Sequence, residues 1–594
     1  MYGFLIFLFS YLTSFNWQYI TATPYQNCKL LPSSPQWPSI AQWQALNEST
    51  SGRLLAPSPL CTACHLPFNN VSCAAVGAQW ANSSWHAENP WSADYNDNSC
   101  LPDSTASCSA LGYPAYVVEA HGASDVQAAL NFARRTGVRL IVKGTGHDFS
   151  SRSSGPGSLS IWTHHIRGVN VTRKDPRAMA YGGVASVEIA AGMQWKDVYA
   201  TAISHNLTVV GGGDPNVGIG GWILGGGHSP VSSRYGMGAD QVLEMEVVTA
   251  DGEYRVVNET SHSDLFWALR GGGGSTYAVL LSVTVIAYER LPTIGYRFSY
   301  DTVADSDTFW SLAAYFHQQL SRLSDAGAMG YYYVVPAAPS SNNSSDNIGT
   351  ISGFWLFPEK TLKEVGDIMS PMENYMLSSP PWAEDTITGD KKVVEWTDFL
   401  TEFSQNEPQT VGFDVRLGSW LLDETALSRP LETLKTQLRK STPPPWELLG
   451  HLVAGKGVQN ATVPGGSNAV SPHWRNAYSH VVIPRKLSFL DTAAKTAMTT
   501  SLRTEANPAL MDLAPESGAY ANEADPTISG NWQRIFFGNN YPRLLALKEK
   551  WDPEGVFWCK SCVGQELWEV VDGPDEEDRS EWGVGQIGGR ICRK

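Results

Sequence analysis

The sequence predicts an α+β protein, because two long regions mix strand and helix patterns without a strict alternation of the two. In residues 111–290, short apolar strands and helices are separated by glycine-rich loops. Residues 295–505 show a second mixture of helical and strand patterns. Residues 23–110 are rich in Pro, Ser, Asn, Trp and Cys and lack periodicity, which predicts an irregular extension over a larger body. A length of 594 residues agrees with several folding units.

The first mixed region can be divided into elements. Residues 116–119 are predicted to form a strand, and Ser124 is predicted to cap a helix that ends at Gly137. A second strand over residues 139–142 leads directly into the loop 143–148. Further along, the sequence predicts a hairpin of residues 243–247 and 254–257 around Asp251-Gly252, a helix over 264–270 and a strand over 277–287.

Composition and charge exclude several function classes. Hydrophobic residues make up 42% and charged residues 17%, a globular balance and not a disordered one. The formal net charge is -16, without a run of Lys and Arg. An acidic surface repels polyanions, so nucleic acid and anionic membranes are not expected as partners.

The N-terminus predicts a secreted protein. Residues 3–12 are apolar but too short to span a bilayer, and a small-residue exit follows near Ala22, as in a signal peptide. No other apolar run approaches membrane length, and the C-terminus carries no retention or lipidation signal. Nine glycosylation sequons fit this route, at Asn47, Asn70, Asn82, Asn170, Asn206, Asn258, Asn342, Asn343 and Asn460.

The nine cysteines gather at the two ends of the chain. Cys61-x-x-Cys64 and Cys559-x-x-Cys562 could each suggest zinc, but neither has a second ligand pair at zinc spacing. In an oxidising compartment disulfides are the better interpretation, with one thiol left over. The sequence therefore predicts no metal site.

The most informative stretch is the glycine-rich window 211–240, which holds eleven glycines. Glycine lets backbone N–H groups approach a ligand closely, and clustered amides bind anions such as a pyrophosphate. The spacing of a Rossmann fingerprint fails, because Ile223 stands where the third glycine belongs. A Walker A loop is absent as well, since no G-K-[ST] occurs. A set of purely structural turns is the alternative.

Several motifs in order resemble one family. The loop KGTGHDF at 143–149, the glycine window and DLFWALRGGGGSTYAV at 264–279 look like the FAD-linked oxidases of the vanillyl-alcohol-oxidase type. The closing NWQRIFFGNNYPRLLALKEKWDPEGVF at 531–557 is similar to berberine-bridge-like enzymes. The Cys-rich start and SIWTHH at 160–165 resemble a fungal subgroup of isoamyl-alcohol-oxidase-like proteins. The resemblance covers residues 110–290 and 515–570 most strongly.

The resemblance implies an α+β fold made of a two-part PCMH-type FAD-binding domain and an α/β substrate domain with an antiparallel sheet. The expected division is a signal peptide (1–22), a Cys-rich extension (23–110), the FAD-binding domain (111–292), the substrate-binding domain (293–505), a berberine-bridge-like segment that completes the FAD site (506–570) and an acidic tail (571–594).

The resemblance also implies FAD, carried on one covalent bond to His147. Bicovalent relatives use a second attachment, a cysteine just before the Pro-x-x-Gly segment, and here that position is Asp214. A non-covalent histidine near FAD is the alternative for His147. The expected cofactor-binding residues are Lys143, Gly144, Thr145, Gly146, His147, Asp148, Gly213, Asp214, Gly218, Gly220, Gly221, Gly225, Tyr235, Gly238, Ala239, Asp240, Asn540 and Tyr541.

Tyr520 is the expected catalytic residue. It stands in GAYANEAD, which resembles the active-site strand of the family, and it is the candidate base; a ring-packing tyrosine is the alternative. Two positions depart from the family pattern: Phe149 replaces a frequent tyrosine, and Glu523 stands where some members have histidine. His473, Tyr478 and His480, near a predicted strand at 481–483, are weaker candidates for the base.

The expected reaction is hydride transfer from a small-molecule alcohol or secondary-metabolite C–H bond to the flavin, with O2 reduced to hydrogen peroxide. A dehydrogenase that uses another electron acceptor is one alternative. A flavoprotein that supports a cyclisation, or a binding protein with FAD as a relic, is another. The sequence indicates neither the substrate nor the oligomeric state.

Overall fold

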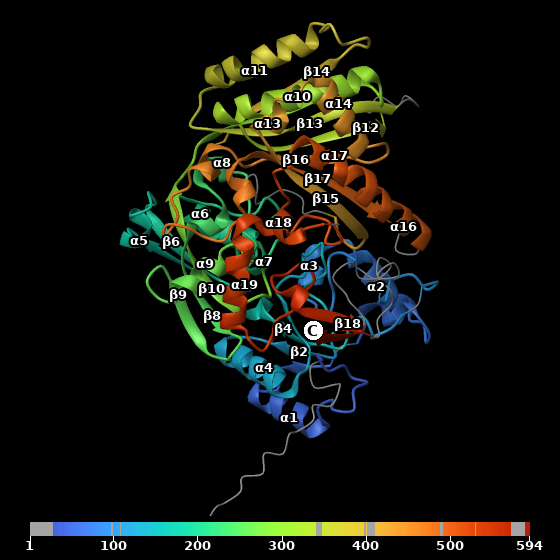
Figure 1. Cartoon of the computed structure of the whole chain (residues 1–594), viewed down its shortest axis with the longest axis vertical. Coiled ribbons are helices and arrows are strands. Elements are labelled where there is room, and N and C mark those ends of the chain that lie inside the picture. The colour runs from blue at the N-terminus through green and yellow to red at the C-terminus, as the bar shows by residue number, and fades with distance from the viewer. Residues whose placement is uncertain are drawn as a thin grey trace, which may run out of the picture.

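The computed structural model describes residues 28–56, 58–96, 99–106, 108–339, 347–396, 400, 410–487, 491–528, 530–571 and 589–594. The expected signal peptide and most of the expected acidic tail lie outside this part of the chain. Helices and sheets share two stacked bodies (Figure 1), and the predicted α+β fold is confirmed. We call them the lower unit (residues 28–290 and 514–594) and the upper unit (residues 293–513).

The lower unit contains a small sheet that ends at the loop 144–149. Its order is β1-β2-β4-β3, with β1 (Leu54–Leu55), β2 (Tyr116–Glu119), β4 (Leu159–Trp162) and β3 (Leu140–Lys143). Strands β2, β4 and β3 run parallel, and β1 is antiparallel to β2. Helix α4 (Ala123–Thr136) connects β2 to β3 and ends at Gly137. Its N-cap is Gly122 and not Ser124, because Asp125 turns back to accept the His121 amide.

A second sheet of the lower unit forms most of its core. The order is β5 (Val169–Arg173), β6 (Ala185–Ala190), β10 (Ala278–Glu289), β8 (Val242–Thr249) and β9 (Tyr254–Asn258), and β7 (Leu207–Val209) pairs with the end of β10. The first ten residues of β10 are all buried, which explains its continuous apolar sequence. The short helices of this unit are α5 (Pro176–Met179), α6 (Trp195–Ser204), α7 (Ile219–Leu224), α8 (Ser232–Tyr235) and α9 (Ser263–Leu269).

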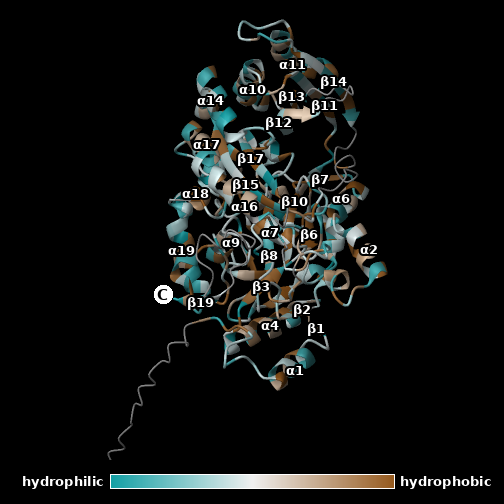
Figure 2. Cartoon of the chain, turned by 90° about the vertical axis from the view of Figure 1, so that its right-hand side faces the viewer, coloured by the Kyte–Doolittle hydropathy of each residue, from teal (hydrophilic) through white to brown (hydrophobic). Residues whose placement is uncertain are grey.

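The upper unit is a seven-stranded antiparallel sheet with helices over one face (Figure 1). Its order is β14 (Thr388–Trp396), β11 (Thr293–Val303), β13 (Asn347–Pro358), β12 (Met329–Pro339), β16 (Leu448–Leu452), β17 (Ala477–Leu487) and β15 (Asp414–Asp423). The helices of this unit are α10 (Asp307–Asp325), α11 (Leu362–Leu377), α13 (Glu424–Leu427), α14 (Leu431–Ser441), α15 (Lys456–Gln459), α16 (Thr492–Ser501) and α17 (Asn507–Leu513). Helix α14 carries mainly hydrophilic residues in Figure 2, whereas α11 also exposes Leu362, Tyr375 and Leu377.

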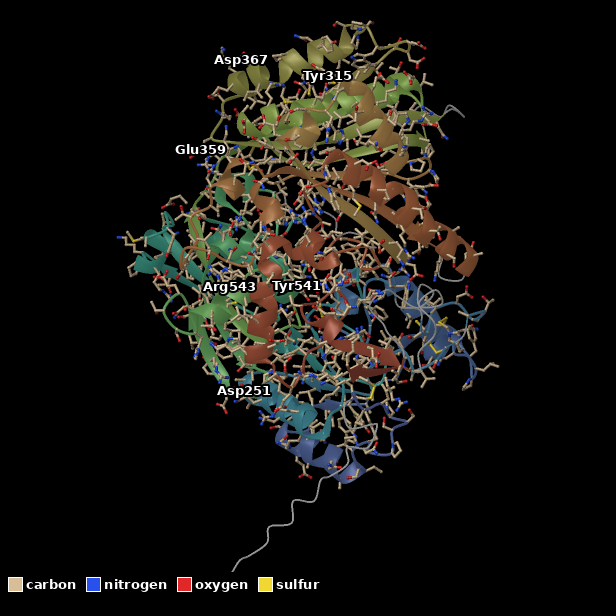
Figure 3. The ribbon with its side chains drawn as sticks, in the orientation of Figure 1. Asp251, Tyr315, Glu359, Asp367, Tyr541 and Arg543 are labelled. Carbon is tan, nitrogen blue, oxygen red and sulfur yellow. A yellow bond between two sulfur atoms is a disulfide. The ribbon has the colours of Figure 1, made fainter. Side chains whose placement is uncertain are left out.

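After α17 the chain returns to the lower unit. Helices α18 (Trp532–Phe537) and α19 (Tyr541–Trp551) lie on its outer side, where Figure 3 labels Tyr541 and Arg543. Lys548 of α19 donates to the carbonyl oxygen of Thr276 at 2.7 Å, and Tyr277 donates to that of Leu544 at 2.9 Å. The last segment is thereby fixed against the loop 271–275, between α9 and β10.

The N-terminal extension is more regular than the sequence predicts. It forms α1 (Ile40–Ser49), α2 (Asn70–Gln79) and α3 (Ser83–Ala87), each with a Ser or Asn side chain at its N-cap. These helices are short, and α2 buries no residue, so their apolar residues show no clear period. Their caps are the signal that could have located them.

Four disulfides join eight of the nine cysteines: Cys28–Cys592, Cys64–Cys73, Cys100–Cys108 and Cys559–Cys562. Cys61 is buried and lies outside these pairs. The tail expected over 571–594 needs correction, because β19 (Arg590–Arg593) pairs with β18 (Trp568–Val571) and Cys592 is bonded to Cys28. The last residues are thus part of the fold.

In the described ranges, no helix has the length and apolar character that a membrane crossing requires.

Removing the Cys28–Cys592 disulfide by a double Ser substitution is expected to lower the unfolding free energy by about 2–5 kcal/mol, since it closes a very long loop. Thermal unfolding followed by circular dichroism measures the change. The Cys64–Cys73 pair, which closes a short loop, serves as the control and should cost less when removed. An equal loss for both pairs would argue against loop closure as the cause.

Candidate functional site

Two adjoining cavities lie near the junction of the two units, the first within the lower unit and the second between the lower and the upper unit. The first, the glycine cavity, is lined by the loop 144–149, by α7 and by residues 520–523 of the C-terminal segment. The second, the sheet cavity, has a volume of about 520 Å³ and is lined largely by strands of the upper unit. His147, Phe149, Val217, Trp222 and Glu523 line both cavities. Part of a ligand bound in the glycine cavity can therefore contact a second molecule bound in the sheet cavity.

The loop that carries His147 is anchored by the N-terminal extension. Lys143, the last residue of β3, is buried and donates from Nζ to the carbonyl oxygen of Asn89 at 2.7 Å. Gly146 has a φ of 88°, and a Cβ there would come within 3.2 Å of the Ser92 carbonyl oxygen. Only glycine lets the loop turn this close to the extension. The loop thereby presents His147 to both cavities.

Asp94 of the extension holds the His147 side chain. Its Oδ2 lies 2.8 Å from Nδ1 of His147 and accepts a second hydrogen bond from the Ser83 hydroxyl at 2.6 Å. Burial acts to lower the pKa of His147, but the hydrogen bond and charge of Asp94 outweigh it and raise this pKa above its ordinary value. The ring is therefore fixed in place, and a buried carboxylate stands ready to accept its proton.

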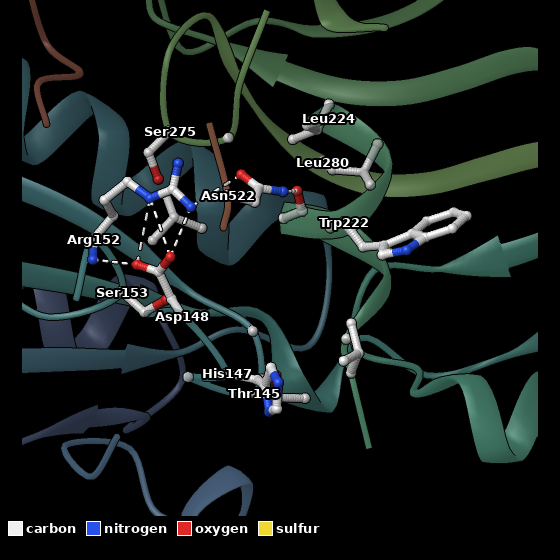
Figure 4. A pocket seen from close by; sticks show the side chains of 18 of the residues that line it. Thr145, His147, Asp148, Arg152, Ser153, Trp222, Leu224, Ser275, Leu280 and Asn522 are labelled. Carbon is white, nitrogen blue, oxygen red and sulfur yellow. Dashed lines mark hydrogen bonds and ion pairs between the residues drawn. The ribbon is translucent and has the colours of Figure 1, made fainter. Parts of the chain in front are cut away.

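An ion pair and an amide connect the loop to the C-terminal segment (Figure 4). Arg152 Nη2 donates to Asp148 Oδ1 at 2.7 Å and to Asn522 Oδ1 at 3.0 Å. Asn522 in turn donates to the Tyr520 hydroxyl at 2.9 Å and to the Gly221 carbonyl oxygen at 3.2 Å. Burial alone would raise the pKa of Asp148, but Arg152 holds it below its usual range. Three sequence-distant walls of the glycine cavity are thus held together.

The glycines of α7 leave room for a ligand. A Cβ built on Gly220 or Gly221 would meet no atom within 4 Å, although both residues line the cavity. A Cβ on Gly218 would lie 3.0 Å from Thr145, so this glycine allows the helix start to approach the His147 loop. The site therefore has a backbone surface open to a bulky group, as the sequence predicted from its glycines.

Tyr520 is buried at the glycine cavity, with its ring against Trp474 and His228. Burial raises the pKa of the phenol well above its ordinary value. The hydroxyl is consequently neutral near pH 7 and can donate a hydrogen bond. The role of proton acceptor that the sequence suggested for Tyr520 stays a prediction.

The predicted cofactor-binding residues divide into those that line one of the two cavities and those that line neither. Gly144, Thr145, Gly146, His147, Asp148, Gly218, Gly220 and Gly221 line the glycine cavity, and Gly213 and Asp214 line the sheet cavity. Lys143, Gly225, Tyr235, Gly238, Ala239, Asp240, Asn540 and Tyr541 line neither. Lys143 holds the extension in place.

The residues outside both cavities have structural partners. Asp240 forms an ion pair with Arg475 at 2.7 Å, and Tyr235 stacks on Tyr288. Asn540 donates to the Val470 carbonyl oxygen. A Cβ on Gly225 would collide with Asn522, and one on Gly238 would collide with Trp222. Gly238 and Ala239 lie behind Trp222, so they support the wall of the site from outside.

Other site residues have their own partners. Tyr541 donates to Glu566. Of the weaker candidates for the base, His473 is engaged with the Arg534 carbonyl oxygen and Tyr478 with Asp325, whereas His480 lies near Glu523. His480 is therefore the one of the three that approaches the cavities.

Sequence reasoning missed several residues of the site. Asp94 lies 53 positions before His147, in a segment without motif, and Arg152 looks like an ordinary loop arginine. His228 stands within the glycine window, and a histidine inside a predicted ligand-binding loop was a signal that could have located it. His451 sits on a strand and carries no local pattern.

Parts of the chain match two protein-family models, and the whole chain resembles known proteins. Residues 114–258 match the FAD binding domain model, and residues 519–563 match the model for berberine and berberine-like proteins. The chain is 34% identical to an FAD-linked oxidoreductase, ZEB1, of Gibberella zeae, over 93% of this chain and 95% of the relative. It is 32% identical to the VAO-type flavoprotein oxidase VAO615 of Thermothelomyces thermophilus, over 92% of this chain and 94% of the relative.

Among solved structures, a VAO-type flavoprotein from Myceliophthora thermophila, MtVAO713, superposes with a TM-score of 0.85 at 26% identity. The match covers 96% of this chain and 100% of the other. Both units and the C-terminal segment therefore follow the architecture of that protein. The glycine cavity is lined mostly by residues of the two regions that match the family models, and otherwise by residues 274–280.

Proposed function

Because the chain belongs to the FAD-linked oxidoreductases of the vanillyl-alcohol-oxidase and berberine-bridge-like family, we propose that it is a secreted oxidase with FAD on a single covalent bond to His147. Its substrate is an alcohol or a secondary-metabolite C–H bond, and O2 is the electron acceptor. The observation that carries the proposal is His147, fixed by Asp94 at the junction of the two cavities.

The residues of the glycine cavity fit FAD. Gly220 and Gly221 leave space that a Cβ would fill, and Gly144, Thr145 and Gly146 form the facing wall. When bound, FAD supplies a hydride acceptor and a route for electrons to O2. No cysteine stands at Asp214 or elsewhere along the described cavity walls, in keeping with one covalent bond.

The protein's own groups would act as follows. His147 would hold the cofactor through a C–N bond that replaces a C–H bond of the flavin, and Asp94 would accept the proton that the imidazole releases. The two electrons of the lost C–H bond would stay on the flavin until O2 removes them. Arg152, Asp148 and Asn522 keep the cavity walls in register. Tyr520, the proposed catalytic residue, donates a hydrogen bond from its neutral phenol to the substrate oxygen. This contact would orient the substrate, and the substrate's hydroxyl proton would pass to a carboxylate on the wall of the sheet cavity, Asp214 or Glu447.

The sheet cavity is the proposed substrate site. Its wall is rich in aromatic side chains, and it also contains Lys486 and the carboxylates of Asp214, Glu447 and Glu523. The aromatic residues are Tyr95, Phe149, Trp222, Tyr331, Tyr333, Phe354 and Phe413. An apolar or ring-containing substrate fits this lining better than a highly charged one.

An absorbance spectrum of the purified protein tests the flavin bond. After acid precipitation and trypsin digestion, the yellow colour should stay with the peptide that contains His147. In His147→Ala the flavin should appear in the supernatant, while the protein still binds FAD. A wild-type protein that releases all its flavin would exclude the covalent bond, and a protein that cannot be loaded with FAD would exclude the proposed function.

Electron acceptors test the oxidase proposal. The dithionite-reduced protein should be reoxidised by air-saturated buffer within seconds, with release of hydrogen peroxide. Slow reoxidation by air together with fast reoxidation by an artificial dye would assign the protein to the dehydrogenases.

N-terminal sequencing tests the proposed secretion. Protein taken from the culture medium should show cleavage near Ala22.

Covalent loading should depend on pH in a defined direction. Only the neutral imidazole can attack the flavin, and Asp94 raises the pKa of His147 above its ordinary value of about 6.5. The rate of covalent loading of apo-protein with FAD should therefore be low at pH 6.5 and increase as the pH rises through this raised pKa. Denaturing gels that detect flavin fluorescence measure the rate. A flat or falling profile would exclude the neutral imidazole as the limiting species.

A further inference from the structure

Three histidines and one carboxylate meet beside the sheet cavity. They are His228, after α7; His451, on β16; His480, on β17; and Glu523, in the C-terminal segment. One ligand atom of each lies within 4.8 Å of those of the other three. We call these four residues the histidine cluster. It joins both units of the protein, and the proposed redox chemistry has no use for three imidazoles at one point.

The sheet register creates half of the cluster. His451 and His480 are directly paired across β16 and β17, so their side chains point to the same face of the sheet. Their Nδ1 atoms are 3.1 Å apart, and both side chains are buried. Two imidazoles thus turn the same ring atom toward one point.

The lower unit supplies the other half. Gly227, at a φ of 64°, packs against the Trp222 ring, and the Trp222 indole donates to the His228 carbonyl oxygen at 3.1 Å. The turn after α7 is thereby fixed, and His228 Nε2 lies 3.0 Å from Glu523 Oε1. The other carboxylate oxygen, Oε2, lies 3.5 Å from His480 Nδ1 and 3.9 Å from His451 Nδ1.

Hydrogen bonds do not satisfy this arrangement. Glu523 Oε2 is buried and has no hydrogen-bond partner among the described residues, although it faces two imidazole nitrogens. Burial lowers the pKa of His451 and of His480 well below the ordinary value, so both rings are neutral. Glu523 itself remains ionised, because His228 outweighs the effect of burial on its pKa. A buried carboxylate oxygen without a hydrogen-bond partner is an unfavourable arrangement unless a cation joins it.

We propose that the histidine cluster binds one divalent transition-metal ion, with Zn²⁺ as the best fit, through His228, His451, His480 and Glu523. Imidazole nitrogen and carboxylate oxygen are ligands that zinc prefers, and neutral rings are ready to coordinate it. In a tetrahedral zinc site, bonds of about 2.0–2.1 Å place ligand atoms about 3.3 Å apart. The distances among His451 Nδ1, His480 Nδ1 and Glu523 Oε2, which are 3.1, 3.5 and 3.9 Å, scatter around that value, and the other oxygen, Oε1, lies 3.0 Å from His228 Nε2.

Four protein ligands close a tetrahedral shell, so the ion has a structural role and no open position for substrate. It connects the sheet of the upper unit to the α7 turn and to the segment that carries Tyr520. The ion would thus fix the wall between the two cavities. The ligands are separated by as many as 295 residues, which explains why ligand spacing in the sequence gave no indication of the site.

Metal analysis of the full-length, flavin-loaded protein tests this proposal. Protein stripped with a chelator and reloaded with ZnCl2 should retain about one zinc ion per chain after gel filtration, as a closed four-ligand site requires. Loading with CoCl2 should give absorption bands between about 550 and 700 nm, as expected for tetrahedral Co²⁺. Zinc should also raise the melting temperature of the stripped protein.

The variant His480→Gln should lose bound zinc and the zinc-dependent rise in melting temperature. His317→Gln is the matched control, because His317 is an equally buried imidazole of the upper unit outside the cluster, bonded to the Ala313 carbonyl oxygen. It should bind zinc as the wild type does. The melting temperature of the stripped wild-type protein is measured with and without zinc. The outcome therefore does not depend on how well a variant folds.

Wild-type protein that retains less than about a tenth of an equivalent of zinc and shows no zinc-dependent melting shift would overturn the proposal. The cluster would then be a hydrogen-bonded relay in which Glu523 accepts a proton. The flavin spectrum is recorded on the same samples. Intact flavin without zinc rejects the metal site alone, whereas missing flavin rejects the proposed function.

Discussion

Replacing Gly221 by leucine is expected to give a colourless protein without oxidase activity. Gly221 lines the glycine cavity, and a Cβ on it would meet no protein atom within 4 Å. A leucine side chain would therefore fold without a clash and occupy the space proposed for FAD. The ratio of absorbance at 450 nm to that at 280 nm measures the loss, with circular dichroism as the check on folding.

Gly366→Leu is the matched control for this change. Gly366 is also a helical glycine, in α11, and a Cβ there likewise meets nothing within 4 Å. It lies far from both cavities in the upper unit, so its flavin content should equal that of the wild type. Full flavin loading in Gly221→Leu would show that the cofactor does not pass along α7.

Asp94→Asn is expected to reduce covalent attachment of FAD by about tenfold or more, since a factor of ten needs only about 1.4 kcal/mol. The carboxylate is fully buried, fixes the His147 ring and accepts its proton in the proposed attachment. Asparagine keeps the shape but cannot accept the proton as a charged base. Flavin released on acid precipitation, compared with flavin retained on the peptide, measures the effect.

Asp175→Asn serves as the control for Asp94→Asn. Asp175 is also buried and ion-paired, here with Arg177, but it lies outside both cavities. Its flavin should remain covalent. If Asp94→Asn attaches FAD as completely as the wild type, another group must accept the proton from His147.

The sequence predicted the parts of the site that depend on local backbone. The loop 143–149 follows a recognisable strand, and the glycines at 218, 220 and 221 form an open surface because glycine has no Cβ. The strands β2, β9 and β10 lie within about one or two residues of their expected positions, since their apolar patterns are strong. Local composition and periodicity were sufficient to predict this loop, these glycines and these strands.

Partners brought together by tertiary structure could not be predicted in the same way. Asp94 reaches His147 from a segment whose short helices show no apolar period, and His451 meets His480 only through the register of β16 and β17. The pKa of Tyr520 depends on burial, which no motif shows. Such features arise from the packing of two units, and a single sequence contains no spacing that reports it.

The return of the chain to the lower unit after residue 513 has a consequence for biosynthesis. Tyr520, Asn522 and Glu523 complete the glycine cavity, and Cys592 closes the fold through Cys28. A ribosome makes these residues last, so a nascent chain holds His147 and the glycine loops without their closing wall. We therefore expect the proposed FAD to be captured only by the finished polypeptide, and a chain truncated before residue 520 to carry no cofactor even though His147 and its loop are intact.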